Sequence, residues 1–176
     1  MNEIGKAALE LARAAVETYC REEKIISPPD DLPEKLTGEE SGVFVTLKKN
    51  GDLRGCTGTF QPTRKNIAQE IIHNALGSAF RDPRFNPVEA EELPDLVYTV
   101  SFLSEPEDIS GPDELQADRY GVIVEKGRRR GLLLPDLEGV DTVEQQLEIA
   151  RRKAGIPPGE EDVSLKRFEV EKYSEE

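Results

Sequence analysis

Apolar and polar residues alternate along two runs, 42–49 and 52–59, that flank the dipeptide Asn50-Gly51. This dipeptide is a strong hairpin signal, because a type I′ turn requires positive φ at both central positions. If Asn50 and Gly51 alone form the loop, Lys49 faces Asp52 and the pairing continues outward from there. The face that looks buried then carries Val43, Val45, Leu47, Arg54 and Cys56. In this register Leu47 faces Arg54 and Val45 faces Cys56. A β-bulge at Gly55 or Gly58 would reverse the phase beyond it.

Apolar residues recur at helical spacing in three segments, which we predict to be helices. They cover residues 3–21, 63–80 and 141–154, and the last two begin with the capping residues threonine and aspartate. The middle helix presents an apolar stripe of Ala68, Ile71, Ile72, Ala75, Leu76 and Ala79. Its polar face carries Asn66, Glu70 and His73. Asp82-Pro83 ends it, because the residue before proline disfavours the helical region.

Further strands follow the middle helix. Residues 96–103 alternate as a strand, residues 120–126 and 129–135 pair as a second hairpin, and residues 164–173 close the chain. Together with the three helices, these elements predict an α+β fold. We expect a mostly antiparallel sheet built from hairpins with about three helices, as a larger lobe plus a smaller lobe formed by part of residues 30–90.

Length and composition place the chain among single globular domains. It has 176 residues with 36 acids, 23 bases and a net charge of −13, which disfavours nucleic acid as a partner. No apolar run approaches the roughly 20 residues that cross a bilayer, so we expect no membrane association. Two cysteines and no export signal predict a reduced, cytoplasmic setting.

The charge is uneven along the chain. Between residues 41 and 86, seven basic side chains stand against three acidic ones, which leaves a local charge of +4 in an acidic protein. Such a segment could attract an anionic group. The alternative is that these are ordinary solvated side chains.

Arg54 and Cys56 are the residues that fit the hairpin least well. An arginine on an apolar face must pair or reach water. Arg54 could bind a carboxylate or phosphate of a ligand, or it could pair with an internal carboxylate such as Asp82 or Glu105. A cation beside a thiol lowers its pKa and activates it as a nucleophile, so Cys56 and Arg54 are the candidate catalytic residues. The alternative is that Cys56 is a small buried side chain opposite Val45.

The candidate ligand-binding residues cluster around this hairpin and the end of the middle helix: Arg54, Gly55, Cys56, Thr57, Gly58, Arg81, Asp82 and Arg84. A salt-bridged helix end is the alternative reading of the last three. A Cys–His pair would need His73, whose place on the polar face argues against it. The chain has no zinc-ligand pattern, no P-loop, no dinucleotide fingerprint and no nucleophile elbow, so we predict no metal site and no cofactor.

Several short motifs occur together in one order. They are Gly42-Val43-Phe44-Val45-Thr46-Leu47, Leu53-Arg54-Gly55-Cys56-Thr57-Gly58, Asp82-Pro83-Arg84-Phe85, Glu92-Leu93, Ser104-Glu105-Pro106-Glu107 and Gly131-Leu132-Leu133-Leu134-Pro135. In this combination the chain resembles the AMMECR family over about residues 42–173. It departs from the family pattern in three places, with Thr57 for an aliphatic residue, Tyr120 for a histidine and Asp136 for a glutamine.

The resemblance implies an α+β protein with a larger and a smaller lobe and a functional role for the Leu-Arg-Gly-Cys segment. No reaction is firmly assigned to the family. Microbial relatives are often encoded beside, or fused with, Memo-like and radical-SAM proteins, which implies partners of those kinds by association.

Two functional hypotheses follow. In the first, the chain is a binding or accessory module, and a cleft around residues 53–58 holds an anionic small molecule or peptide. In the second, it is a thiol enzyme with Cys56 as nucleophile and Arg54 as electrostatic stabiliser. We prefer the first, because the sequence offers no general base near the thiol.

Overall fold

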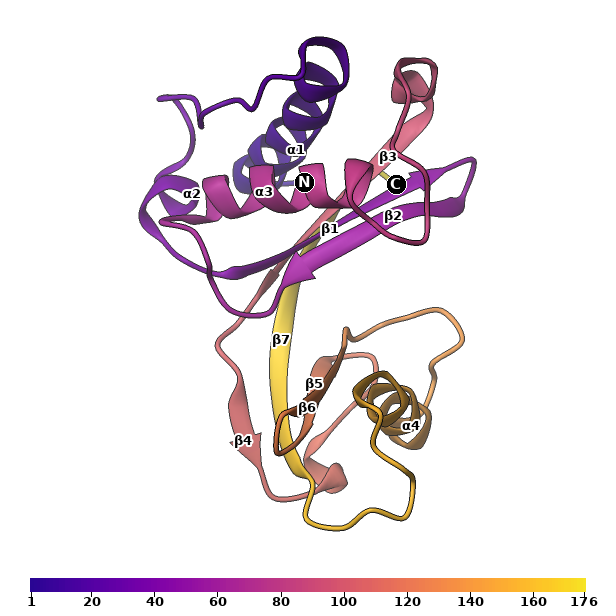
Figure 1. Cartoon of the computed structure of the whole chain (residues 1–176). Helices are drawn as coiled ribbons and strands as arrows, with labels where there is room; N and C mark the ends of the chain where they lie inside the picture. Colours follow the sequence, from indigo (N-terminus) through magenta and orange to yellow (C-terminus); the bar gives the residue numbers. More distant parts are fainter. The chain divides into compact units, whose positions relative to one another are not determined.

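The computed structural model describes residues 1–176 and divides into two compact units. Unit 1 contains Met1–Leu103 and Glu171–Glu176, and unit 2 contains Ser104–Val170 (Figure 1). Residues 30–90, where we expected part of the chain to form a small lobe, all belong to unit 1. The second compact unit is instead the segment between the third strand and the end of the chain.

The structure contains the three predicted helices, a further short helix and an antiparallel set of strands, which confirms the α+β class. The helices are α1 (Glu3–Glu22), α2 (Glu34–Gly38), α3 (Ile67–Phe80) and α4 (Val143–Ala154), with 3₁₀ turns η1 (Ala90–Asp95) and η2 (Pro112–Glu114). The strands are β1 (Gly42–Lys49), β2 (Asp52–Thr59), β3 (Leu96–Leu103), β4 (Glu107–Ile109), β5 (Tyr120–Lys126), β6 (Arg129–Leu133) and β7 (Ser164–Ser174).

The core of unit 1 lies between a sheet and its helices. Its strands run in the order β2-β1-β3, followed by the last part of β7, and Figure 1 shows α1 and α3 on the same side of β1–β3. The face toward the helices carries fully buried apolar side chains, including Val45, Leu47, Tyr98 and Val100. The predicted apolar stripe of α3 is buried in this core along its whole length. Burying such faces is the main favourable term in folding.

The first hairpin forms as predicted at its turn and differs beyond it. Asn50 and Gly51 both have positive φ, and Lys49 pairs with Asp52. The predicted pairing of Leu47 with Arg54 is wrong: the register shifts, so that Leu47 pairs with Gly55 and Arg54 is the extra residue. The alternative register had a bulge at Gly55 or Gly58. The bulge lies at Arg54 instead, and it reverses the phase of β2 beyond that residue.

The phase change moves the side chains of β2 between faces. Cys56 pairs with Thr46 rather than with Val45, and Val45 pairs with Thr57. Cys56 is half-buried rather than packed in the core. The expectation that Cys56 shares the buried face with Val45 is therefore wrong.

Two helices begin later than their sequences suggested. The N-cap of α3 is Asn66, whose side chain accepts from the amide of Gln69, and not Thr63. The N-cap of α4 is Thr142, which forms a capping box with Gln145. In each case a residue close to the predicted cap had the same capping chemistry, so the pattern located the helix but not its first residue.

Unit 2 has its own small core. Within it β4 and β5 flank β7, and β6 pairs with β5 through a two-residue loop in which Gly127 has positive φ. Helix α4 packs on this sheet and buries Ala150, while Gly155 ends the helix in the left-handed conformation. The second hairpin and the closing strand are thus present as predicted.

Candidate functional site

Cys56 belongs to a row of polar side chains that crosses the sheet of unit 1. Its register partner is Thr46, Thr46 in turn pairs with Thr99, and the hydroxyl of Thr99 lies 2.9 Å from that of Ser174. The Cys56 Sγ atom lies 3.2 Å from the Thr46 hydroxyl oxygen. Because side chains alternate along a strand, this row lies on the sheet face opposite α1 and α3. The thiol therefore sits in a hydrogen-bonding environment of hydroxyl groups.

The glycines of the motif have structural explanations within unit 1. A Cβ atom on Gly55 would overlap the carbonyl oxygen of Ser78 in α3, so this position lets the helix approach β2 closely. A Cβ atom on Gly58 would overlap the ring of Phe44 on the neighbouring strand. The close approaches that we attributed to a ligand or a bulge are therefore made by the protein itself.

Thr57 faces α3 and is fully engaged there. Its amide donates to the Ser78 hydroxyl at 2.8 Å, and its own hydroxyl donates to the Asn74 carbonyl at 3.1 Å. These bonds satisfy the polar groups of Thr57 inside unit 1. They also place Thr57 in the packing of unit 1 rather than beside Cys56.

Arg54 pairs with Glu92, and the expected pairings with Asp82 or Glu105 are wrong. Its Nε and Nη2 atoms donate to the two carboxylate oxygens of Glu92 at 2.9 Å each. Lys49 adds a third contact to the same carboxylate at 3.1 Å. The hydrogen bonds from Arg54, with smaller contributions from the Glu89 amide and Lys49, lower the pKa of Glu92 to about 2 although burial opposes this shift. Arg54 is thus neutralised by an internal partner 38 residues away.

Asp82 organises the turn after α3 and links it to Cys56. Its almost fully buried carboxylate accepts from the amide of Cys56 at 3.0 Å and from the amide and guanidinium of Arg84. These donors, the Arg84 side chain first, hold the pKa of Asp82 well below its usual range. Arg84 also donates to the Cys56 carbonyl at 3.3 Å. The predicted salt-bridged turn is therefore present, and it brings Arg84 beside Cys56.

Arg81 lies apart from this cluster. Its Nη2 atom donates to the carbonyl of His73 in α3 at 3.2 Å. His73 also receives a contact from Arg64, with Nη2 of Arg64 lying 3.0 Å from Nδ1 of the ring. Among the predicted site residues, the structure thus brings Arg84, Asp82 and Cys56 together and directs Arg81 toward a different part of unit 1.

Cys56 and His73 lie on opposite sides of the unit 1 sheet. His73 belongs to α3, which packs on the face of Val45 and Thr57, whereas Cys56 faces the other way. A Cys–His catalytic pair is therefore not formed, in agreement with the interpretation of His73 as a polar-face residue.

Glu70 is a buried carboxylate that the sequence pattern did not reveal. It is 1% exposed and accepts from the hydroxyls of Thr59 and Thr63 and from the amides of Thr63 and Arg64. These four hydrogen bonds lower its pKa in spite of its burial. The only available signal was the run of hydroxyl and amide donors between residues 59 and 64, which precedes the helix in sequence.

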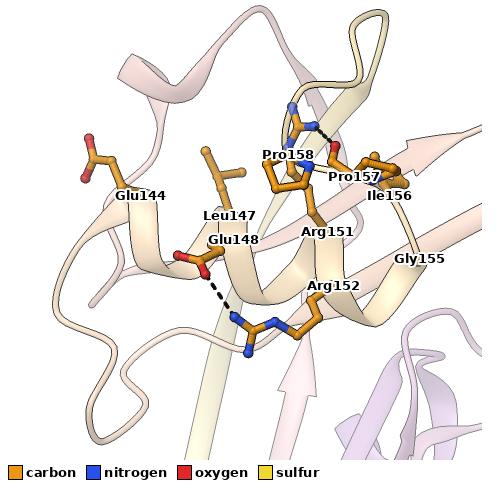
Figure 2. Close-up of a pocket in the computed structure, with 9 residues that line it drawn as sticks. All are labelled: Glu144, Leu147, Glu148, Arg151, Arg152, Gly155, Ile156, Pro157 and Pro158. Atoms are coloured by element: carbon orange, nitrogen blue, oxygen red, sulfur yellow. Dashed lines mark hydrogen bonds and ion pairs between the residues drawn. The ribbon is translucent and has the colours of Figure 1, made fainter.

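Unit 2 contains a surface pocket of about 570 Å³ along α4 (Figure 2). Its apolar lining includes Leu147, Ile156, Pro157 and Pro158. Figure 2 shows that its arginines are engaged: Arg152 pairs with Glu148, and Arg151 donates to the Pro157 carbonyl. No predicted site residue lines this pocket.

No group of three or more His, Cys, Asp or Glu side chains is arranged to hold a metal ion. None of the helices combines the length and the apolar character needed to cross a membrane.

Comparison with known proteins identifies relatives along nearly the whole chain. A protein of Thermotoga maritima is 54% identical over 90% of this chain and 91% of its own length. The crystal structure of the uncharacterized protein PH0010 from Pyrococcus horikoshii, 40% identical, matches with a TM-score of 0.93 and covers 100% of this chain and 93% of its own. A Clostridium acetobutylicum protein is 48% identical over 95% of this chain, which corresponds to 36% of that longer protein. The family model described as AMMECR1 matches residues 9–173, and the chain therefore belongs to the AMMECR1 family.

Proposed function

We propose that this chain is a binding module whose ligand is an anionic small molecule or a peptide carboxylate, held at the edge of β2 beside Cys56. The observation that carries the proposal is the state of Arg84. Its side chain is 55% exposed, yet Asp82 and the Cys56 carbonyl hold its guanidinium in one orientation. A guanidinium that is both oriented and exposed can bind an anion at little further entropic cost.

The second candidate, a thiol enzyme with Cys56 as nucleophile, has weaker support. Arg54, its expected electrostatic stabiliser, is bound on two nitrogens by Glu92. His73, the one histidine, is on the other side of the sheet. What favours the enzyme is the Thr46 hydroxyl in contact with the thiol and the nearby charge of Arg84.

The test is a titration of ¹⁵N-labelled protein with inorganic phosphate and, separately, with succinate, followed by amide chemical shifts. We expect saturable shifts of the Cys56, Thr57, Gly58 and Arg84 amides. Arg84→Gln should weaken binding at least tenfold, whereas Cys56→Ala should bind as the parent does. Shifts that do not saturate, or that survive Arg84→Gln, would contradict the proposal.

A matched control exists in unit 2. Arg119 is 59% exposed, pairs with Glu169 and lies over the ring of Tyr120, much as Arg84 pairs with Asp82 and lies over Phe85. Arg119→Gln removes the same charge from the protein and should leave the titration unchanged. A loss of binding in this variant would show that net charge, and not the Arg84 position, is responsible.

The accessory role extends this proposal to a partner protein. The family resemblance suggests Memo-like or radical-SAM partners in a reduced, cytoplasmic setting. The Clostridium relative adds that this domain occurs within a longer chain, as expected for a module that works beside another domain. A purified Memo-like protein from the same organism is the direct probe, and its binding should survive Cys56→Ala.

A further inference from the structure

Unit 1 contains a second pocket, of about 290 Å³, on the outer side of α3. We call it the His73 pocket, and its residues are Ile25, Ile26, Ser27, Pro28, Arg64, Gln69, Ile72, His73, Leu76 and Arg81. One wall is α3 and the other is the connector that follows α1. Neither the Arg84 cluster nor the polar row of Cys56 contributes to it.

The two arginines of the pocket converge on one histidine and have no carboxylate partner. Arg64 contacts the ring Nδ1 atom of His73 at 3.0 Å, and Arg81 donates to the carbonyl of the same residue at 3.2 Å. Neither arginine forms an ion pair, and no acidic residue lines the pocket. The chain carries 36 acids against 23 bases, so two arginines that contact one histidine and have no ion-pair partner are a local exception.

A buried carboxylate holds the backbone at Arg64 in place. The buried carboxylate of Glu70 accepts from the backbone amide of Arg64 at 2.8 Å. Four hydrogen bonds from residues 59–64 occupy Glu70, so that carboxylate fixes the loop and forms no ion pair with the Arg64 guanidinium. The positive charge of Arg64 therefore stays available within the pocket.

His73 adds a neutral donor between the arginines. Since Nδ1 faces the Arg64 guanidinium, it acts as the acceptor, and the ring proton lies on Nε2. The remaining lining is apolar, with Ile72 and Leu76 from α3 and Ile25 from the connector. Ile25 is 62% exposed, one of the few large apolar side chains left open to water.

We propose that the His73 pocket binds a small organic carboxylate with an apolar body. The carboxylate lies between the Arg64 and Arg81 guanidinium groups, and the apolar body lies against Ile25, Ile72 and Leu76. Charge complementarity selects the acid group, and the apolar wall selects against inorganic anions. The volume is at the lower end for ligand pockets, which limits the ligand to a small molecule.

The test is a titration with hexanoate, using hexanamide as an uncharged probe of the same shape and acetate as a charged probe without the apolar body. Amide shifts of ¹⁵N-labelled protein report the location of binding. We expect saturable shifts at Gln69, Ile72, His73 and Leu76 with hexanoate, and at least tenfold weaker binding of hexanamide and of acetate. Equal binding of hexanoate and hexanamide would overturn the proposal.

Substitutions of the pocket arginines test whether hexanoate binds in the His73 pocket. The double variant Arg64→Gln/Arg81→Gln should weaken hexanoate binding at least tenfold, with a circular dichroism spectrum like that of the parent. Arg151→Gln/Arg152→Gln, which removes two arginines from the α4 pocket, is the matched control and should bind normally. Undiminished binding by the Arg64/Arg81 variant would overturn the proposal. Arg84→Gln should not affect hexanoate binding, so this site and the Arg84 site succeed or fail separately.

Discussion

Four arginines of unit 1 form two pairs that meet opposite kinds of partner. Arg54 and Arg84 each bind a carboxylate, that of Glu92 and Asp82 respectively. Arg64 and Arg81 instead contact the neutral ring and the carbonyl of one histidine. All four lie close in sequence to the hairpin or to α3, so sequence position alone does not distinguish the two pairs.

The difference separates arginines whose charge is paired with a carboxylate of the fold from arginines that pair with no carboxylate. Asp82 and Glu92 are largely buried, with 2% and 16% of their side chains exposed, and their cations offset the cost of removing them from water. Removing one partner there leaves an unpaired charge. In the His73 pocket the arginines neutralise nothing, so their removal should cost binding and little stability.

The largest effect should come from Asp82. Asp82→Asn removes the charge that orients Arg84 and weakens the bonds to two backbone amides, so we expect the free energy of unfolding to fall by about 3–4 kcal/mol. Urea denaturation followed by circular dichroism measures this change. Asp108→Asn, at an ion-paired carboxylate that is 86% exposed, is the control and should cost less than about 0.5 kcal/mol. Similar losses of unfolding free energy in the Asp82→Asn and Asp108→Asn variants would contradict a structural role of the buried Asp82 carboxylate.

The pH dependence of stability should follow the same carboxylates. The pKa of Glu92 falls from 4.5 to about 2 in the folded protein, and the pKa values of Asp82 and Glu70 are lowered as well. A lowered folded-state pKa contributes stability above the unfolded pKa, and this is lost as pH falls through the folded value. Between pH 5 and 2, Glu92 alone should account for up to about 3 kcal/mol. Glu92→Gln should flatten the curve in urea titrations across this range; an unchanged slope would contradict the assignment.

A double-mutant cycle on Arg54 and Glu92 isolates their interaction. Because the pair is bidentate and mostly buried, we expect a coupling energy of about 2 kcal/mol from Arg54→Gln, Glu92→Gln and the double variant. The same cycle on the exposed pair Arg119 and Glu169 should give below about 0.5 kcal/mol. A small coupling at Arg54 would mean that its charge is not committed to Glu92, and would return it to the candidate site.

The elements governed by local pattern could be predicted, and the partners of the charged residues could not. The Asn50-Gly51 turn, the apolar stripe of α3 and the alternation of β3 each follow from a period within one segment. At the bulge, Arg54 binds Glu92, which lies 38 residues away in sequence. No periodicity reports such a contact. The sequence therefore showed that Arg54 does not fit an apolar strand face, but it did not show that Glu92 is its partner.

Glu70 is a second residue whose surroundings could not be predicted from local periodicity. Helical periodicity put it on a polar face with His73, and that assignment of faces is correct for His73, which lines an open pocket. Glu70 is buried because residues 59–64 fold back over it and supply four hydrogen bonds. The sequence shows which face of a helix is polar. It does not show whether that face is exposed to solvent or covered by protein, and in α3 the preceding loop covers Glu70.

Substitution of the arginines of the His73 pocket should have a small effect on the free energy of unfolding. Arg64→Gln and Arg81→Gln each remove a partly solvated guanidinium without stranding an acid, so each should change the free energy of unfolding by less than about 0.5 kcal/mol. The same urea titrations used for Asp82 provide the measurement. A loss of 2 kcal/mol or more in either variant would mean that the fold depends on these arginines, and would contradict their contrast with Arg54 and Arg84.

The smallest effect, and the most specific, should be the titration of His73 itself. Burial and the charges of Arg64 and Arg81 lower its pKa, while Glu70 opposes them weakly. Because a nearby cation disfavours the protonated ring, Arg64→Gln should raise the His73 pKa, and the double variant with Arg81→Gln should raise it further. His73 is the one histidine, so its ring protons can be followed across pH 4–9 by NMR without assignment. Bound hexanoate should act in the same direction as these substitutions, because its carboxylate offsets both guanidinium charges. If the pKa rises in the variants but not with hexanoate, the arginines act on His73 as described and the carboxylate does not reach them.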